Sequence, residues 1–344
     1  MTLHPEHAGV ATVTVEAHEA HGLLVDALKS LGVDDADVDV AAQHFLAAEE
    51  RGRGGINRLT QLARSLDPQG PGECAPIAVV RETAATALVD GGGHLGYAVA
   101  DHTTRIAIAK AKANGIAAVA ANNHRYSGVL GHYVELVARE GLVAIAVGSG
   151  NLPVVAPFGG RTAGLCTNPI AFGFPTPGEP IVWDAASASV SGHLLEIAQR
   201  LGQPLPEGAA VDESGQLTRD PASARAGALF AWGGHRGSGL AVAIQLLGLL
   251  ANIGADLHNL ADWEGAFLMI AIDPSRFLAE DQFQVAAAEF AEGIRATPPA
   301  QGHDAVRMPS DRSLGGREDR RRAGFEVDAT ELDELRRLAN RRPG

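Results

Sequence analysis

Two glycine-rich stretches of this 344-residue chain carry the kinds of groups that hold phosphate oxygens. The first covers residues 151–192 and ends in a strand-like run with three candidate ligands, Asp184, Ser187 and Ser189. The second, Ala231–Ala241, reads AWGGHRGSGLA and contains Arg236. Backbone N–H groups, hydroxyls and a nearby cation are what the phosphates of a nicotinamide dinucleotide require. Neither stretch is a GxGxxG placed after a strand, so neither is a Rossmann fingerprint. Strand packing of the serines and a tight glycine turn before a helix remain the alternative interpretations.

Three arginines gather in the segment RGRGGINRL, which begins at Arg51. Arginine is well suited to grip a substrate carboxylate, because its planar guanidinium can donate two parallel hydrogen bonds. Arg53 beside Arg58 indicates a substrate with additional negative charge, or one that is held at two carboxylates. Ordinary surface charge in a loop would explain Arg51 and Arg53 equally well, so both interpretations stay open.

Composition restricts the class of protein. A formal net charge of −13 argues against nucleic acid or an anionic membrane as the main partner. Cys74 and Cys166 are too few for a disulfide framework and have no metal-ligand spacing. No signal pattern and no apolar run of 18 residues is present. We expect a cytoplasmic protein that binds no nucleic acid and no membrane. We also expect no metal, because the remaining histidines are scattered: His94, His102, His132, His258 and His303.

Helical and strand periodicities alternate along the chain, which predicts an α/β fold. Helices are expected at 18–31, 34–50, 96–114, 131–140, 190–201 and 239–250, and over most of 274–296. Strands are expected at 75–90, 116–121, 142–147, 170–174, 181–184 and 267–272. The arginine-dense tail Asp311–Arg322 is interpreted either as a solvated surface loop or as a cofactor contact.

Several unusual motifs occur in the order that is typical of the malate/L-lactate dehydrogenase family, which binds NAD(P) without a Rossmann fold. GHLGYAVADHTTRIAIAKAKANGIAAVA resembles the family's DGxxxxG segment and following helix, and GLCTNPIAFGFP resembles its GLTNP segment. VWDAASAS resembles its D-x-(A/S)-x-S strand, and GQPLPEGAAVDESGQLTRDPASA is similar to IPxxWAxDxxGxxTxDPxxA. The resemblance runs from about residue 15 to the C-terminus.

This resemblance implies a non-Rossmann malate/L-lactate dehydrogenase-type fold, in which a mixed, largely antiparallel sheet is surrounded by helices. We expect an N-terminal helical segment at 1–75 that contributes substrate and dimer contacts. A cofactor-binding α/β core would follow at 76–275, and a C-terminal helical segment at 276–344 would pack back on the N-terminal part. The cofactor would lie in a cleft, and the N-terminal helices would complete the site across a homodimer interface.

The expected NAD(P)H contacts follow the family motifs, although the sequence does not separate NAD from NADP. They are Asn151, Asp184, Ser187, Ser189, His193, His235, Arg236, Ser310, Asp311 and Arg312. His193 stands where members often have lysine, and Ser310 follows the RMP of an RxPG-like turn. A small anionic carboxylate is the expected substrate, with contacts from Arg53, Arg58, Asn151 and Thr167.

The catalytic histidines of the family are replaced in this chain. In the motif RGxxSHGxxR(L/F), Arg58 matches the carboxylate-binding arginine, but the serine and histidine positions fall on Arg53 and Gly54. In the motif NSxHxG the histidine position holds Tyr126, and His124 lies two residues earlier. Ketone reduction needs a proton donor, worth about 10²–10⁴-fold in rate. We therefore expect Tyr126 or His124 to act in catalysis together with Arg58. A protonated imine needs less help, because hydride addition to it gives a neutral amine.

These observations favour an NAD(P)H-dependent oxidoreductase that reduces a small 2-oxo acid or a cyclic 2-imino acid, with a specialised biosynthetic pathway as one setting. Two alternatives stay open on the same scaffold: a redox-neutral isomerase or cyclase, and a non-catalytic relative that binds the cofactor. The three differ in behaviour. The first consumes NAD(P)H, the second binds it without net consumption, and the third changes no substrate.

Overall fold

The computed structural model describes residues 11–65, 74–251 and 264–341 and divides into two compact units. The helical unit comprises residues 1–74, 176–181 and 281–344, and the sheet unit comprises 75–175 and 182–280. His258, one of the scattered histidines, lies outside the described residues.

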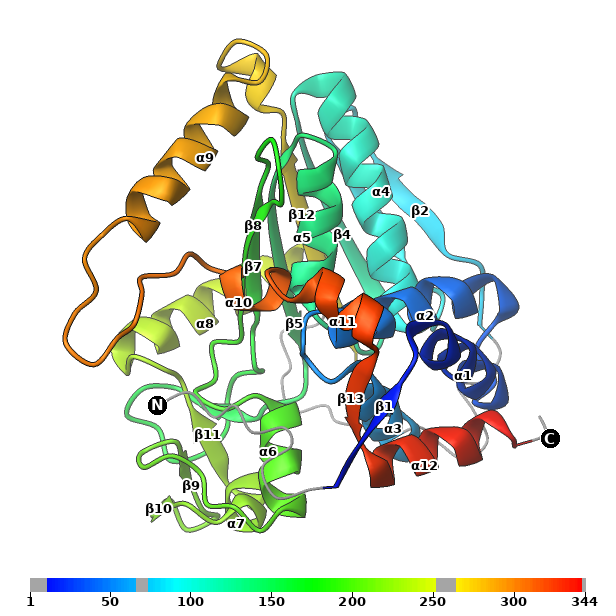
Figure 1. Ribbon diagram of the computed structural model, residues 1–344, viewed down its shortest axis with the longest axis vertical. Coiled ribbons are helices and arrows are strands. Elements are labelled where there is room, and N and C mark those ends of the chain that lie inside the picture. The colour runs from blue at the N-terminus through cyan, green and yellow to red at the C-terminus, as the bar shows by residue number, and fades with distance from the viewer. Residues whose placement is uncertain (1–10, 66–73, 252–263, 342–344) are drawn as a thin grey trace. The chain divides into compact units, whose positions relative to one another are not determined.

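A seven-stranded sheet in the order β2-β3-β4-β12-β5-β7-β8 forms the centre of the sheet unit (Figure 1). Its strands are β2 (Ala78–Glu82), β3 (Thr86–Asp90), β4 (Ile116–His124), β5 (Val143–Gly150), β7 (Ile170–Phe174), β8 (Ile181–Ala185) and β12 (Gly265–Ile272). β3 and β4 run parallel, whereas β2–β3, β4–β12, β12–β5 and β5–β7 are antiparallel pairs. The mixed, largely antiparallel sheet is therefore confirmed.

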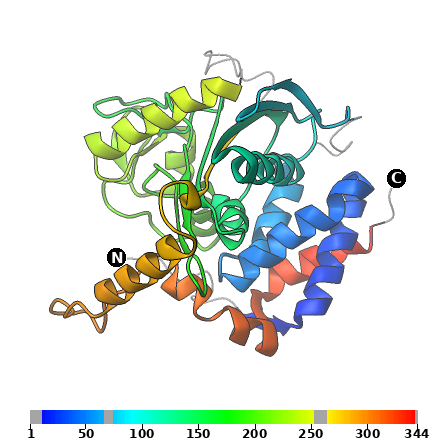
Figure 2. The same cartoon turned by 90° about the horizontal axis from the view of Figure 1, so that it is seen from above.

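Helices cover both faces of this sheet, as Figure 2 shows. Alternate residues of a strand point to opposite faces. Val119 and Phe267 accordingly belong to the core that includes α4 (Gly96–Asn114) and α5 (Leu130–Arg139). Ala120 and Leu268 belong to the core on the other face, beneath α8 (His235–Gly248). A 3-10 turn, η1 (Leu249–Ala251), continues α8.

A smaller four-stranded sheet, in the order β10-β9-β11-β6, completes the sheet unit. Its strands are β6 (Val155–Ala156), β9 (Ala210–Val211), β10 (Leu217–Thr218) and β11 (Ala228–Phe230). The buried side chains around it include Leu195 of α6 (Gly192–Arg200) and Ala224 of α7 (Pro221–Ala226).

The helical unit joins the two ends of the chain. Strand β1 (Thr12–Val15) pairs antiparallel with β13 (Phe325–Asp328). The helices of this unit are α1 (Ala17–Ser30), α2 (Asp35–Glu50), α3 (Gly55–Ser65), α9 (Gln282–Arg295), α10 (Asp311–Leu314), α11 (Arg317–Ala323) and α12 (Ala329–Ala339). A short 3-10 turn, η2 (Pro274–Arg276), belongs to the sheet unit and precedes α9 in sequence.

Most predicted helices and strands are confirmed to within a few residues, with three corrections. The expected strand over 75–90 is a hairpin of two strands, because the chain turns where the N–H of Thr83 donates to the carbonyl of Thr86 (2.9 Å). The helix predicted to begin at residue 239 begins at His235. The segment 311–322 is not a loop, since it forms α10 and most of α11.

Candidate active site

The arginine-rich segment forms a tight turn between α2 and α3. Gly52 and Gly54 both adopt left-handed backbone angles, with φ of 64° and 61°. A Cβ atom on Gly55 would lie 1.8 Å from the carbonyl oxygen of Phe45, so α3 starts directly against the backbone of α2. The buried carboxylate of Glu49 accepts a hydrogen bond from the N–H of Ile56 (2.6 Å) and anchors this start.

Arg53 and Arg58 meet at this turn, as the sequence predicts. The Nε of Arg58 donates to the backbone carbonyl of Arg53 (2.9 Å), and both residues are half-buried. Arg51 is buried. The turn therefore holds Arg58 by the backbone of Arg53 and leaves part of each guanidinium side chain accessible.

His124 ends β4 and is enclosed. It is 2% exposed, and Cβ atoms on Gly96 and Gly265 would lie 2.8 Å from its Nδ1 and 2.9 Å from its Cε1. Neither ring nitrogen has a hydrogen-bond partner of ordinary geometry among the described residues. Burial lowers the pKa of His124 to about 4, and the backbone at Ala121 opposes this shift only in part. The imidazole is therefore neutral at physiological pH.

Tyr126, two residues later, is 38% exposed and has a φ of 54°, which is unusual for a bulky residue. Its neighbours are anchored on both sides. The N–H of Gly96 donates to the carbonyl of Arg125 (2.5 Å), and the hydroxyl of Tyr133 donates to the carbonyl of Ser127 (2.7 Å). A left-handed non-glycine residue persists where its surroundings over-determine it. The two candidate proton donors thus differ: His124 is enclosed, and Tyr126 reaches the surface.

The serines and Asp184 of the first glycine-rich stretch already have partners inside the sheet unit. One carboxylate oxygen of Asp184 accepts a hydrogen bond from the N–H of Gly131 at the start of α5 (2.9 Å). The hydroxyl of Ser187 donates to the carbonyl of Thr167 (2.8 Å), and that of Ser189 donates to the carbonyl of Ala209 (3.2 Å). Both serine protons are therefore engaged in this arrangement, which leaves their oxygens as acceptors.

Asn151 and His193 are buried. The side-chain oxygen of Asn151 accepts from the N–H of Glu264 (3.0 Å), beside the backbone bond from the N–H of Asn151 to the carbonyl of Glu264. His193 lies in the first turn of α6, whose cap is the hydroxyl of Ser191.

The start of α8 is open. Gly233 and Gly234 before it are left-handed, and His235 and Arg236 in its first turn are exposed. The ring of His235 packs edge-on against Phe158, with centroids 5.8 Å apart. A Cβ on Gly233 would meet no atom within 4 Å. The first N–H groups of an α-helix lack partners within the helix, so an open start of this kind can receive an anion.

In the helical unit, Ser310 occupies the N-cap position of α10, and its backbone is in the left-handed region with a φ of 66°. Asp311 accepts two hydrogen bonds from Arg295 (2.6 and 3.0 Å) and one from the N–H of Met308 (2.8 Å). The bond from Arg295 lowers the pKa of Asp311. Arg312 is exposed.

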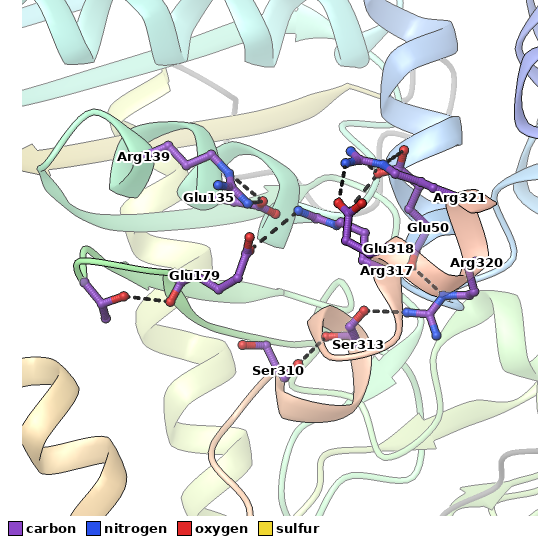
Figure 3. Close-up of polar contacts among 11 residues, drawn as sticks. Glu50, Glu135, Arg139, Glu179, Ser310, Ser313, Arg317, Glu318, Arg320 and Arg321 are labelled. Atoms are coloured by element: carbon purple, nitrogen blue, oxygen red, sulfur yellow. Dashed lines mark hydrogen bonds and ion pairs between the residues drawn. The ribbon is translucent and has the colours of Figure 1, made fainter.

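A polar cluster on α11 was not predicted from the sequence. Figure 3 shows three guanidinium groups from this helix, those of Arg317, Arg320 and Arg321, in contact with Glu50 at the end of α2. Their spacing of three and four residues on one helix was a usable signal for a shared face. Their partner, however, lies about 270 residues away in sequence.

Across the described residues, no group of three or more histidine, cysteine, aspartate or glutamate side chains could hold a metal ion. Asp101 and Glu135 form ion pairs with Arg105 and Arg139. In the described ranges, no helix combines the length and apolar character needed to cross a membrane.

Comparison with known proteins identifies the family. Residues 15–336 match the family described as malate/L-lactate dehydrogenase. The chain is similar to L-sulfolactate dehydrogenase of Methanocaldococcus jannaschii, with 34% identity over 327 residues, 92% of this chain and 94% of the relative. It is also similar to Delta(1)-pyrroline-2-carboxylate reductase 1 of Burkholderia ambifaria, with 32% identity over 340 residues, 95% and 97% of the two chains.

The crystal structure of delta1-piperideine-2-carboxylate reductase from Pseudomonas syringae pvar. tomato superposes with a TM-score of 0.81 at 28% identity. The match covers 95% of this chain and 100% of the reductase chain. The chain is therefore an enzyme of the dehydrogenase and reductase type, and it belongs to the malate/L-lactate dehydrogenase family.

Proposed function

We propose that this enzyme transfers a hydride between a nicotinamide dinucleotide, NADH or NADPH, and a small carboxylate with a C=N or C=O bond at carbon 2. The similar proteins support this, because their names cover a 2-hydroxy acid, sulfolactate, and cyclic imino acids such as pyrroline-2-carboxylate. Of the two substrate types, we favour the cyclic imino acid.

The open start of α8 supports a dinucleotide. Its helix dipole and the exposed guanidinium of Arg236 both favour a pyrophosphate, and left-handed Gly233 leaves room for close approach. We assign the Ser310–Arg312 turn, with its exposed Arg312, as a further cofactor contact. When bound, the nicotinamide supplies the hydride. Asn151, Asp184, Ser187, Ser189, His193 and His235 remain proposed cofactor contacts.

The substrate carboxylate is assigned to Arg58, oriented by its bond to the Arg53 carbonyl. A half-buried guanidinium loses little water on binding an anion and can hold both carboxylate oxygens. Thr167 and Asn151 complete the proposed substrate contacts.

The observation that carries the preference for an imino acid is the contrast between His124 and Tyr126. His124 is enclosed and neutral, so at neutral pH it lacks the acidic proton of an imidazolium. The exposed donor at this turn is a phenol, which is a weaker acid than an imidazolium. A cyclic iminium arrives with its proton already on nitrogen, so hydride addition yields the neutral amine without a donated proton. A ketone would need the Tyr126 hydroxyl to protonate the developing alkoxide.

One observation favours a second candidate, a 2-oxo acid with two negative charges. The backbone of Arg53 contacts Arg58 and the Arg53 side chain is partly accessible, so a second guanidinium from this turn would suit a second acidic group on the substrate. In that case Tyr126 would be the proton donor.

The test measures NADH and NADPH consumption with two substrate pairs: Δ1-pyrroline-2-carboxylate and Δ1-piperideine-2-carboxylate, against oxaloacetate and sulfopyruvate. We expect the imino acids to be reduced faster. Tyr126→Phe should leave imino-acid turnover within a few fold and slow any 2-oxo-acid turnover by about 10²-fold or more. Faster wild-type reduction of the 2-oxo acids would replace the first candidate by the second. Cofactor binding without consumption of any substrate would favour a redox-neutral enzyme.

Arg58→Ala should weaken substrate use by about 2–4 kcal/mol in kcat/KM, because a charge-assisted bidentate contact is lost. NADH affinity should stay within about twofold. Arg105→Ala, an exposed arginine of α4 paired with Asp101, is the matched control and should leave both quantities unchanged. An equal loss of NADH affinity in Arg58→Ala would remove Arg58 from the substrate contacts.

We further propose that the enzyme acts as a homodimer in the cytoplasm. Cys74 and Cys166 form no disulfide, which suits a reducing compartment. Light scattering on the eluting protein measures the mass directly, and a mass of one chain would exclude the dimer.

A further inference from the structure

Arg320 bridges two segments that are far apart in sequence. Its Nε donates to the backbone carbonyl of Glu50 (2.6 Å), and its Nη2 donates to the backbone carbonyl of Ser313 (2.6 Å), as Figure 3 shows. A Cβ on Gly316 would lie 2.5 Å from its Nη1, and one on Gly52 would lie 4.0 Å from its Cζ. The guanidinium therefore lies across two glycine positions, one in each segment.

The first bridged segment leads into the arginine turn. Glu50 is the last residue of α2, the turn from Arg51 to Gly54 follows it at once, and Arg58 lies in the first turn of α3. The hydrogen bond from Arg58 to the Arg53 carbonyl makes the orientation of Arg58 depend on the path of this turn. Any shift of the α2 end relative to Arg320 would therefore reach Arg58.

The second bridged segment is the Ser310 turn. Ser313 lies in α10, and its hydroxyl donates to the carbonyl of Ser310 (3.1 Å), to which the N–H of Leu314 also donates (2.8 Å). Ser310 is held in the left-handed region, so its conformation depends on such local bonds. Arg320 thus contacts the short helix that supports the Ser310–Arg312 turn.

The neighbouring arginines Arg317 and Arg321 contact the carboxylate of Glu50, whereas Arg320 donates to backbone carbonyls. Arg321 holds the buried Glu50 carboxylate with two bonds (2.6 and 2.9 Å), and the Nε of Arg317 lies 3.7 Å from it. Burial, and then repulsion from Arg317, lowers the pKa of Arg320. With Glu50 committed to Arg321, Arg320 is left to satisfy backbone carbonyls, which is the role that makes it a bridge.

We propose that Arg320 is a positioning residue that couples the two turns, so that cofactor bound at Ser310–Arg312 raises the affinity of Arg58 for the substrate carboxylate. This inference rests on the function proposed above. Because coupling between two binding sites is reciprocal, bound substrate raises the affinity for the cofactor by the same factor. A lysine cannot replace Arg320, since one ammonium group lacks the planar fork that reaches two carbonyls.

The test measures binding rather than turnover. Pyrrole-2-carboxylate, a planar acid that cannot be reduced in this way, is titrated by calorimetry with and without saturating NADH, or NADPH if only that binds. We expect the cofactor to tighten binding by on the order of tenfold in the wild-type chain. Arg320→Met should bring this factor close to one, and Arg320→Lys should lower it in part. Arg322→Met, a change to an exposed arginine of the same helix, should keep the wild-type factor.

An Arg320→Met variant with the wild-type coupling factor would overturn the proposal, as would a factor of one in the wild-type chain. Failure of the wild-type chain to bind either cofactor would instead overturn the proposed function. Amide hydrogen exchange then tests separately whether Arg320 holds the two turns in place. Arg320→Met should speed amide exchange in both 51–58 and 310–315, with α1 unchanged as an internal reference. Unchanged exchange in these two segments would show that Arg320 positions neither turn.

Discussion

Two regions bury titratable side chains by opposite means. One is the α2–α11 cluster of the helical unit, formed by Glu50, Arg317, Arg320 and Arg321. The other is the His124 pocket of the sheet unit, in which Gly96 and Gly265 lie against the ring. In the cluster, Glu50 is 7% exposed and receives bonds from Arg321, while Arg320 donates to backbone carbonyls. In the pocket, His124 is 2% exposed and has no hydrogen-bond partner of ordinary geometry within the described residues. The first site pairs acidic and basic groups with each other, and the second keeps its one group neutral by enclosing it.

This difference shows which physical property stabilises each region. The cluster depends on charge balance, because a buried charge without its partner is costly. The pocket depends on shape, because two glycines make room for a ring that must stay uncharged. Substitutions that change charge should therefore damage the first region most, and changes of pH or of volume should damage the second.

The largest expected effect comes from Glu50→Gln. Removing the buried carboxylate leaves Arg317 and Arg321 with only the exposed Glu179 and Glu318 as acidic partners, which should cost about 3–4 kcal/mol of unfolding free energy. The value lies near the lower end for buried pairs because Arg321 is 46% exposed and can reach water. Urea unfolding followed by far-UV circular dichroism measures it. Glu318→Gln, which removes an exposed partner of the same Arg321, should cost no more than about 0.5 kcal/mol. Equal losses in the two variants would mean that burial of Glu50 is unimportant.

The next effect is acid sensitivity of the His124 pocket. The pKa of His124 is about 4 in the folded chain against 6.5 for an ordinary histidine, so the unfolded chain binds the proton more readily between these values. Stability should therefore fall as the pH drops from about 6.5 to about 4, by on the order of 3 kcal/mol in total. Trp183 and Trp232 lie in the sheet unit, so tryptophan fluorescence during urea unfolding reports on this part of the chain.

Two variants isolate the contribution of His124. His124→Leu keeps a similar volume without a titrating group, so it should be at least as stable at pH 7 and lose about this much acid sensitivity. His102→Leu, a change to an exposed histidine of α4, should behave like the wild-type chain. If His124→Leu kept the full acid sensitivity, the pocket would not be the source.

Much of the fold could be predicted because its signals are local. The helix at 96–114 was expected with its observed bounds, since Gly115 ends it in the left-handed conformation. The hairpin within 75–90 was missed because its turn, Thr83–Ala85, contains no glycine, proline, asparagine or aspartate. The segment 311–322 was ambiguous because its arginines could face water equally well in a loop or in a helix.

The candidate site could be predicted only where one segment contains it. Arg53 and Arg58 were expected together and meet within one turn. The neutral state of His124 depends on Gly96 and Gly265, and the position of Arg320 depends on Glu50. These contacts join residues that are distant in sequence, and a single sequence has no signal for such a pairing. The expected replacement of the family's histidines directs attention to the turn at Tyr126, but only the fold separates the exposed phenol from the enclosed imidazole.

The smallest expected effect tests the shape of the pocket directly. In Gly96→Ala the new Cβ would lie 2.6 Å from the carbonyl oxygen of Arg125 and 2.8 Å from Nδ1 of His124. Because one of these neighbours is backbone, the turn must shift, at a cost of about 1–3 kcal/mol. Gly22→Ala in α1 is the matched control, since its Cβ would meet nothing within 4 Å and a helical alanine should stabilise by up to about 1 kcal/mol. Combining Gly96→Ala with His124→Ala sharpens the comparison. If the glycine exists to seat the ring, the smaller side chain should recover part of the loss, whereas additive losses would mean that Gly96 serves only the Arg125 backbone.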